Sequence, residues 1–98
     1  MSQAHWHLLT YDVRDDKRRR KVALFLEGHG RRVQFSVFRI HCSPRQLLHI
    51  RWQLARRLDA VDSLLVIPLP DHVAKRIQTQ SEDTDWTQDN NSTWAIVG

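Results

Sequence analysis

Three aspartates and a run of five cations stand close together near the N-terminus, at Asp12, Asp15, Asp16 and Lys17–Lys21. Carboxylate oxygens are ligands that Mg²⁺ prefers, and the ion commonly takes one or two of them while keeping several waters. Arginine and lysine side chains bind phosphate oxygens through charge-assisted hydrogen bonds. A Mg²⁺ site at Asp12 beside a phosphate site on the cations would suit the binding or hydrolysis of a phosphodiester.

Asp12 alone is a poor metal site, because it supplies one carboxylate per chain. A two-fold axis that brought two copies of Asp12 together would supply the second carboxylate. In the alternative interpretation, Asp12 caps a turn, while Asp15 and Asp16 offset the neighbouring cations at a helix start. The spacing by itself favours that alternative, and the residues leave both interpretations open.

The five cations occupy the expected start of a helix, where the helix macrodipole repels positive charge. Arg18 flanks the core side of this helix, whereas Arg19 and Arg20 project away from it. Exposed N–H groups at the same helix end would bind phosphate together with these side chains. A solvated charged face is the alternative. The predicted nucleic-acid contacts are Arg14, Lys17, Arg18, Arg19, Arg20, Arg31 and Arg32.

Positive charge is concentrated in the first part of the chain. Residues 1–57 hold 13 of the 15 Lys and Arg but only 4 of the 11 Asp and Glu, a balance of +9. Residues 58–98 hold 2 bases and 7 acids, a balance of −5. A basic segment of this density indicates a polyanionic partner, most often nucleic acid, with simple solubilisation as the alternative.

Composition is typical of one globular domain, with 98 residues, 41% hydrophobic and 27% charged. No apolar run approaches the roughly 20 residues of a membrane-spanning helix, and no signal peptide is recognisable, so we expect a cytoplasmic protein. The single cysteine, Cys42, cannot form an internal disulfide. The six histidines are predicted to be surface or interface residues, because no other ligand type stands at metal-binding spacing beside His5 and His7.

Residues 5–12 and 32–41 are rich in β-branched and aromatic side chains and predict strands. The first has apolar side chains on both faces, which indicates burial on both sides. In the second, Phe35 and Val37 share one face, but the apolar positions then move to the other face. A bend or bulge near Ser36 would reconcile the two patterns by splitting the run into two short strands.

A helix is predicted to follow the first strand. Asp15 or Asp16 would cap its N-terminus, and Gly28 or Gly30 would end it. Its apolar residues recur with helical spacing and form a core stripe of Val22, Phe25, Leu26 and His29.

A second helix has the strongest start signal in the chain. Ser43 is the expected N-cap, Pro44 occupies the first helical position, and Gln46 completes a capping box. Trp52 on this helix is assigned to packing, and the arginines stand off the core stripe. The stripe comprises Leu47, Ile50, Leu54 and Leu58.

Residues 63–69 predict the last strand of the domain, ended by proline. The order of these elements predicts an α+β, ferredoxin-like split βαβ sandwich, with an antiparallel sheet, both helices on one face and a partner on the other. This domain is expected to span residues 1–77. Residues 78–98 would form a polar linker and a closing strand, Trp94–Val97, that pairs with a partner subunit.

The stretch TYDVRDDKRRRKVALFLEGHGRRVQFSVFRI, Thr10–Ile40, resembles the small CRISPR-associated Cas-two family. It contains a strand ending in Tyr-Asp, an Asp-Asp-Lys-Arg-Arg opening to a helix, a glycine that ends the helix, and then VQFSVF. DSLLVIPL, Asp62–Leu69, resembles the fourth strand of the family. The combined pattern, from Leu8 to Leu69, is far more specific than any one of its parts.

The resemblance implies a prokaryotic spacer-acquisition protein and endoribonuclease that forms a homodimer through sheet faces and works with the Cas-one integrase. It also implies that the last strand pairs with the other subunit. Asp12 falls on the family's strand-one aspartate, the catalytic residue and Mg²⁺ ligand shared across the two-fold axis. The resemblance places four further residues near that site, namely Tyr11, Arg19, Ser36 and Phe38.

Three functions fit these observations. The first is a CRISPR adaptation protein that binds DNA or RNA and also hydrolyses phosphodiesters with Mg²⁺ and paired Asp12. The second is a purely structural DNA-binding adaptor for spacer integration, without nuclease activity. The third is a toxin-like ribonuclease of the same fold. The first is the expected function, and its weak point is the lack of a second carboxylate within one chain.

Overall fold

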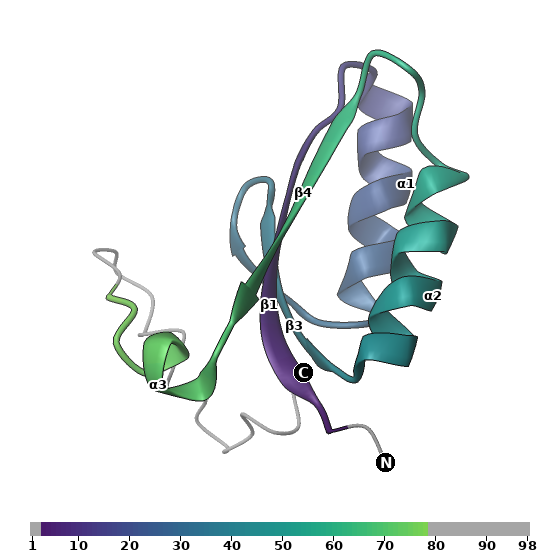
Figure 1. Ribbon diagram of the computed structural model, residues 1–98. Coiled ribbons are helices and arrows are strands. Elements are labelled where there is room, and N and C mark those ends of the chain that lie inside the picture. Colours follow the sequence, from purple (N-terminus) through teal and green to yellow (C-terminus); the bar gives the residue numbers. More distant parts are fainter. Residues whose placement is uncertain (1–2, 79–98) are drawn as a thin grey trace.

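The computed structural model describes residues 3–78. Figure 1 shows α1 and α2 together on one face of a sheet, with the short α3 on the opposite side. The four strands are antiparallel in the order β2-β3-β1-β4, as predicted for a ferredoxin-like α+β fold. The elements are β1 (His5–Asp12), α1 (Asp16–Glu27), β2 (Arg31–Gln34), β3 (Val37–Cys42), α2 (Pro44–Ala55), β4 (Ser63–Leu69) and α3 (Asp71–Ala74).

Two expectations concern the ends of this range. The closing strand predicted at Trp94–Val97 lies outside the described residues, and the domain boundary at residue 77 stays a prediction. Among the helices within residues 3–78, none combines the length and the apolar composition needed to cross a membrane.

Strand β1 lies in the middle of the sheet, and the predicted burial on both faces is complete from His7 to Tyr11 on the helix side, whereas on the other side Trp6 is buried and Leu8 and Thr10 are half-buried. Leu9 and Tyr11 join the main core beneath α1 and α2. Trp6 on the other face packs with Leu69 and Ala74, which belong to β4 and α3. The strand therefore contacts the helices α1 and α2 on one side and α3 on the other. Its last residue, Asp12, lies outside the core at one end of the sheet.

The predicted division of residues 32–41 is confirmed, because β2 and β3 form a hairpin joined by a two-residue turn at Phe35 and Ser36. The backbone N–H of Tyr11 donates to the carbonyl of Ser36 at 3.1 Å, which fastens this turn to the end of β1. The expectation that Phe35 shares an apolar face with Val37 is wrong. The turn directs the Phe35 side chain outward, where it is 71% exposed.

Both predicted helix starts are confirmed. The carboxylate of Asp15 accepts a hydrogen bond from the N–H of Arg18 at 2.9 Å, and this bond lowers the pKa of Asp15. In α2, the Ser43 hydroxyl accepts from the N–H of Gln46 at 3.1 Å, while the Gln46 side chain accepts from the N–H of Ser43 at 2.8 Å. The packing assignment of Trp52 is wrong, because its side chain is 60% exposed on the outer side of α2.

The turn between α2 and β4 is held to the start of α1 by one fully buried carboxylate, Asp62. It accepts hydrogen bonds from Nε and Nη2 of Arg18 at 2.9 and 3.1 Å. It also accepts from the backbone N–H groups of Arg14, at 3.0 Å, and Asp59, at 2.8 Å. The bonds from Arg18, followed by the two backbone bonds, hold the pKa of Asp62 well below its usual range.

Gly30→Ala should destabilise the fold by about 2 kcal/mol or more, because the added Cβ would lie 2.2 Å from the carbonyl oxygen of Arg39. Gly28→Ala is the matched control, since the nearest atom to its Cβ would be 3.5 Å away. This control should be neutral or stabilise by about 0.5 kcal/mol, through the lower entropy of the unfolded chain. Urea unfolding followed by circular dichroism measures both, and equal effects would contradict the predicted close approach.

Asp62→Asn should lower the Tm by several degrees at neutral pH and should flatten the acid limb of the stability curve. Because folding lowers the pKa of Asp62, its contribution is fully present above the unfolded value of about 3.9 and is lost as the pH falls below it. Burial lowers the pKa values of buried His7 and half-buried His41, which also contribute to the acid limb. The histidines contribute equally to wild type and variant, so their contribution cancels in the difference between the two stabilities. If the difference in stability between wild type and Asp62→Asn stays constant from pH 7 to pH 2, the acid limb does not depend on Asp62.

Candidate nucleic-acid interface

Asp12 ends β1 with its carboxylate exposed to solvent, the side chain being 70% accessible. Its ion-pair partner is the guanidinium of Arg14, whose Nε lies 4.0 Å from Oδ2, so the contact is loose. Asp12 pairs in register with Ser63 of β4, at the end of the sheet opposite to the chain's N-terminus. The carboxylate is therefore available to a ligand from solvent.

The neighbouring aspartates bind groups of the protein itself. Asp15 caps α1, Asp16 is ion-paired with Arg19, and Asp62 is bonded to Arg18. Asp12 has the oxygen chemistry and the exposure that Mg²⁺ requires, but it is one carboxylate. Across residues 3–78 no group of three or more His, Cys, Asp and Glu gathers at metal-binding distance. The residues of one chain thus fit half of a two-carboxylate site.

An apolar strip leads along the open face of the sheet, the face opposite α1 and α2, toward Asp12. Residues paired in register lie on the same face, so Leu8 and Ile67 are followed by Thr10 and Leu65, and then by Asp12. Leu65 and Ile67 are exposed hydrophobic residues. Exposed apolar side chains in one continuous strip are typical of a surface that another protein covers.

The cations at the start of α1 divide into two groups. Arg18 binds Asp62, and Arg19 binds both Asp16 and the carbonyl of Val13, the latter at 2.9 Å. Lys17 and Arg20 are exposed. Of the cations predicted to contact nucleic acid at this helix start, Arg18 and Arg19 are therefore both engaged within the protein, whereas Lys17 and Arg20 face solvent.

Arg31 and Arg32 lie on different faces of β2. Arg32 is in register with Phe38 on the helix face, and Arg31 is in register with Arg39 on the open face. The guanidinium of Arg32 donates to the carbonyl of Phe35 at 2.7 Å. The structure thus brings Arg32 to Arg19 and Phe35, and it separates Arg31 from them.

Phe35 lies between two guanidinium groups at the edge of the sheet. The central carbons of Arg19 and Arg32 are each 6.0 Å from the centre of its ring. They border a hollow of about 320 Å³, here called the Phe35 cleft. It is lined by Tyr11, Asp16, Arg19, Arg20, Ala23, Leu24, Glu27, Arg32 and Phe35.

An exposed aromatic ring flanked by arginines can stack on a nucleobase while the cations bind the adjacent phosphates. The cleft has three arginines and two acids, and the acids are paired with two of those arginines, Asp16 with Arg19 and Glu27 with Arg32. Phe35 was not among the residues predicted for the site. The sequence did contain a sign of its exposure. The apolar positions move to the other face of the strand near Ser36, which indicates a turn, and a residue in a turn is commonly exposed.

The aromatic residues that the resemblance placed near the site belong to the core. Phe38 is fully buried and cannot contact a base in this conformation. Tyr11 stacks on it with ring centres 6.2 Å apart, and burial raises the pKa of Tyr11, so its phenol keeps its proton at neutral pH. Ser36 takes part through its backbone carbonyl. Phe38 and Tyr11 therefore support the site from beneath.

One histidine departs from the expected surface or interface position. His7 is buried on the helix face of β1, with Nδ1 3.9 Å from Sγ of Cys42. Burial lowers the pKa of His7 and raises that of the Cys42 thiol. Both side chains are therefore uncharged at neutral pH, as expected for core packing.

The chain is similar in sequence and in fold to known proteins of one family. The chain is 35% identical to CRISPR-associated endoribonuclease Cas2 3 of Synechocystis sp. over 77 residues, which cover 78% of this chain and 84% of that relative. It is 49% identical to CRISPR-associated endoribonuclease Cas2 2 of the same organism over 65 residues, covering 63% and 69%. The crystal structure of Streptococcus pyogenes Cas2 matches with a TM-score of 0.70 at 32% identity, covering 78% of this chain and 99% of that one. Residues 5–77 match the sequence model described as CRISPR associated protein Cas2, so the chain belongs to the Cas2 (Cas-two) family.

Proposed function

We propose that this chain is a CRISPR adaptation protein that binds nucleic acid as a homodimer and supports spacer integration together with the Cas-one integrase. Membership of the Cas2 family supports the biological process. The observation that carries the proposal is the exposed carboxylate of Asp12 at the same end of the sheet as Lys17, Arg20 and the Phe35 cleft. This end joins a potential metal ligand, phosphate-binding cations and an aromatic surface for a base.

The homodimer would form through the open face of the sheet. A second copy lying on the apolar strip would bury Leu65 and Ile67, and the burial of exposed aliphatic groups drives association. Because Asp12 lies at the end of that strip, a two-fold axis through the face would bring the two Asp12 carboxylates toward each other. The swapped strand at Trp94–Val97 would add to the same assembly.

In that dimer the two Asp12 carboxylates would hold Mg²⁺, which when bound would lower the pKa of a water and stabilise charge on the phosphodiester. Lys17 and Arg20 would bind the phosphates on either side of the target bond. Phe35 would stack on an unpaired base, with Arg19 and Arg32 flanking it. An exposed stacking surface favours a single-stranded substrate, because the bases of a duplex are already stacked.

A structural DNA-binding adaptor is the second candidate. It is favoured because Asp12 provides one carboxylate per chain and because no multi-ligand metal cluster occurs within residues 3–78. Such an adaptor needs the exposed cations and the dimer, but not Asp12. A toxin-like ribonuclease of the same fold would need Asp12 but no integrase.

Asp12→Asn should abolish Mg²⁺-dependent cleavage, reducing it by about 100-fold or more, because the amide binds Mg²⁺ weakly and cannot provide the negative charge. A labelled single-stranded RNA incubated in Mg²⁺ or in EDTA, with products separated on a gel, measures this. The fold and the affinity for nucleic acid should stay unchanged, since Asp12 is exposed and loosely paired. Cleavage by Asp12→Asn at the wild-type rate would exclude the paired-aspartate mechanism, and no cleavage by either protein would leave the adaptor as the function.

Phe35→Ala should weaken binding of single-stranded RNA by about 5-fold to 100-fold while leaving duplex DNA affinity nearly unchanged, because it removes one stacking surface. Phe35→Leu is the matched control that retains apolar bulk without an aromatic ring, and it should behave like the alanine variant.

Arg20→Ala should weaken binding of both nucleic acids and reduce the salt slope by about 1. Fluorescence anisotropy at several salt concentrations measures all three. Wild-type RNA affinity in Phe35→Ala would contradict a stacking role.

A further inference from the structure

Helix α2 carries a second apolar stripe on the side opposite the core. Ile50 and Leu54 of its core stripe are buried, yet Leu48, Trp52 and Ala55 recur at i, i+4 and i+7 on the outer side. Leu48 is 66% exposed and Trp52 is 60% exposed. A helix that is apolar on two sides is normally buried on two sides, so the outer stripe indicates a surface that another element covers.

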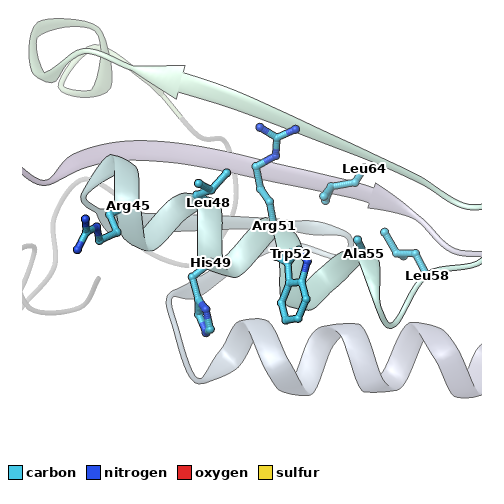
Figure 2. A pocket seen from close by; sticks show the side chains of 8 residues that line it. All are labelled: Arg45, Leu48, His49, Arg51, Trp52, Ala55, Leu58 and Leu64. Carbon is cyan, nitrogen blue, oxygen red and sulfur yellow. The ribbon is translucent and has the colours of Figure 1, made fainter.

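The stripe forms the floor of a groove of about 760 Å³, here called the α2 groove. Figure 2 shows that α2 and the turn after it provide all of its residues except Leu64, which comes from the adjacent strand β4. Because its lining residues follow α2 from Arg45 to Leu58, the groove offers the length that the apolar side of a second helix would need. It is lined by Arg45, Leu48, His49, Arg51, Trp52, Ala55, Leu58 and Leu64.

The rim of the α2 groove is positively charged. Arg45 and Arg51 lie among its lining residues, and the guanidinium of Arg56 lies 5.3 Å from the centre of the Trp52 ring. The segment from Ser43 to Leu58 contains no acidic residue. Exposed aromatic and arginine side chains together are the residues that most often dominate binding energy at protein interfaces.

We propose that the α2 groove binds an amphipathic helix of a partner protein, in which apolar residues at i, i+3, i+4 and i+7 are flanked by Asp and Glu. The apolar side chains would fill the groove over Leu48 and Trp52, and the acids would pair with Arg45 and Arg51. This surface is separate from the Phe35 cleft and from the open face, because no lining residue is shared with either.

A second copy of the chain fits the groove poorly. In a two-fold contact the same patch meets itself, so the arginines of each rim would face like charges. Nucleic acid also fits less well, because Leu48 and Ala55 offer no stacking surface and Arg56 already lies against the ring of Trp52. The combination of an apolar floor and a cationic rim selects a protein segment that carries both apolar and acidic side chains.

The test uses a fluorescein-labelled 18-residue helical peptide with leucine at i, i+3, i+4 and i+7 and glutamate at the flanking positions. Fluorescence anisotropy with the full chain should show saturable binding that weakens as salt is raised. Trp52→Ala should reduce the affinity by about tenfold or more. Val61→Ser, which changes an equally exposed apolar residue outside the groove (63% exposed), should leave it unchanged. Circular dichroism confirms that both variants are folded.

Exchanging the charges of the groove and the peptide tests the proposal most directly. The double variant Arg45→Glu with Arg51→Glu should lose the glutamate peptide and should bind a matched peptide in which lysine replaces every glutamate. Binding of both peptides by the wild type with equal affinity would overturn the proposal, as would no binding of the glutamate peptide up to about 1 mM. These outcomes concern the α2 groove alone and are independent of RNA cleavage.

Three other occupants would be revealed by Trp52→Ala and by one further variant, and each would overturn the proposal. Self-association that Trp52→Ala abolishes would assign the α2 groove to a second copy. Loss of RNA binding in Trp52→Ala, with unchanged peptide binding, would assign it to nucleic acid. Tighter peptide binding after replacement of Glu82, Asp83 and Asp85 by their amides would assign it to the chain's own acidic segment.

Discussion

The buried carboxylate of Asp62 is the constraint on which this end of the molecule depends. It accepts hydrogen bonds from Arg14, Arg18 and Asp59, and so joins the start of α1 to the turn that follows α2. A buried carboxylate without these bonds would be costly, whereas with them it sets the two loops in one arrangement. The backbone leaving β1 is thereby fixed at Arg14, two residues after the exposed Asp12.

The cations at the start of α1 illustrate how structure and function share one segment. Each cation beside the positive end of a helix typically costs about 0.3 to 1 kcal/mol, so five together are unfavourable without compensation. Asp62 offsets Arg18, and Asp16 offsets Arg19, while Asp15 caps the helix. The remaining positive charge faces solvent, where a phosphate backbone would balance it.

Local patterns predicted most of the fold, whereas contacts between distant residues did not follow from them. The capping box at Ser43 involves residues three apart, and the divided strand was visible in its alternation, so both were predicted correctly. Asp62 and Arg18 are 44 positions apart, and nothing local pairs them. Phe35 was assigned to the face of Val37 because alternation assumes a straight strand, and Trp52 was assigned to packing because a tryptophan on an amphipathic helix usually packs. The position of Asp12 at the end of a strand was predicted correctly, and its role in the site stays a prediction.

The central position of β1 also shapes how the chain is made. Its partners β3 and β4 are both later in the sequence, and β4 begins at Ser63 whereas β1 ends at Asp12. At synthesis rates of 5–20 residues per second, roughly 3 to 10 s separate the emergence of β1 from that of β4. During that interval a largely apolar strand has an unpaired edge. The nascent protein is therefore most exposed to misassociation on the ribosome, before β4 pairs with β1.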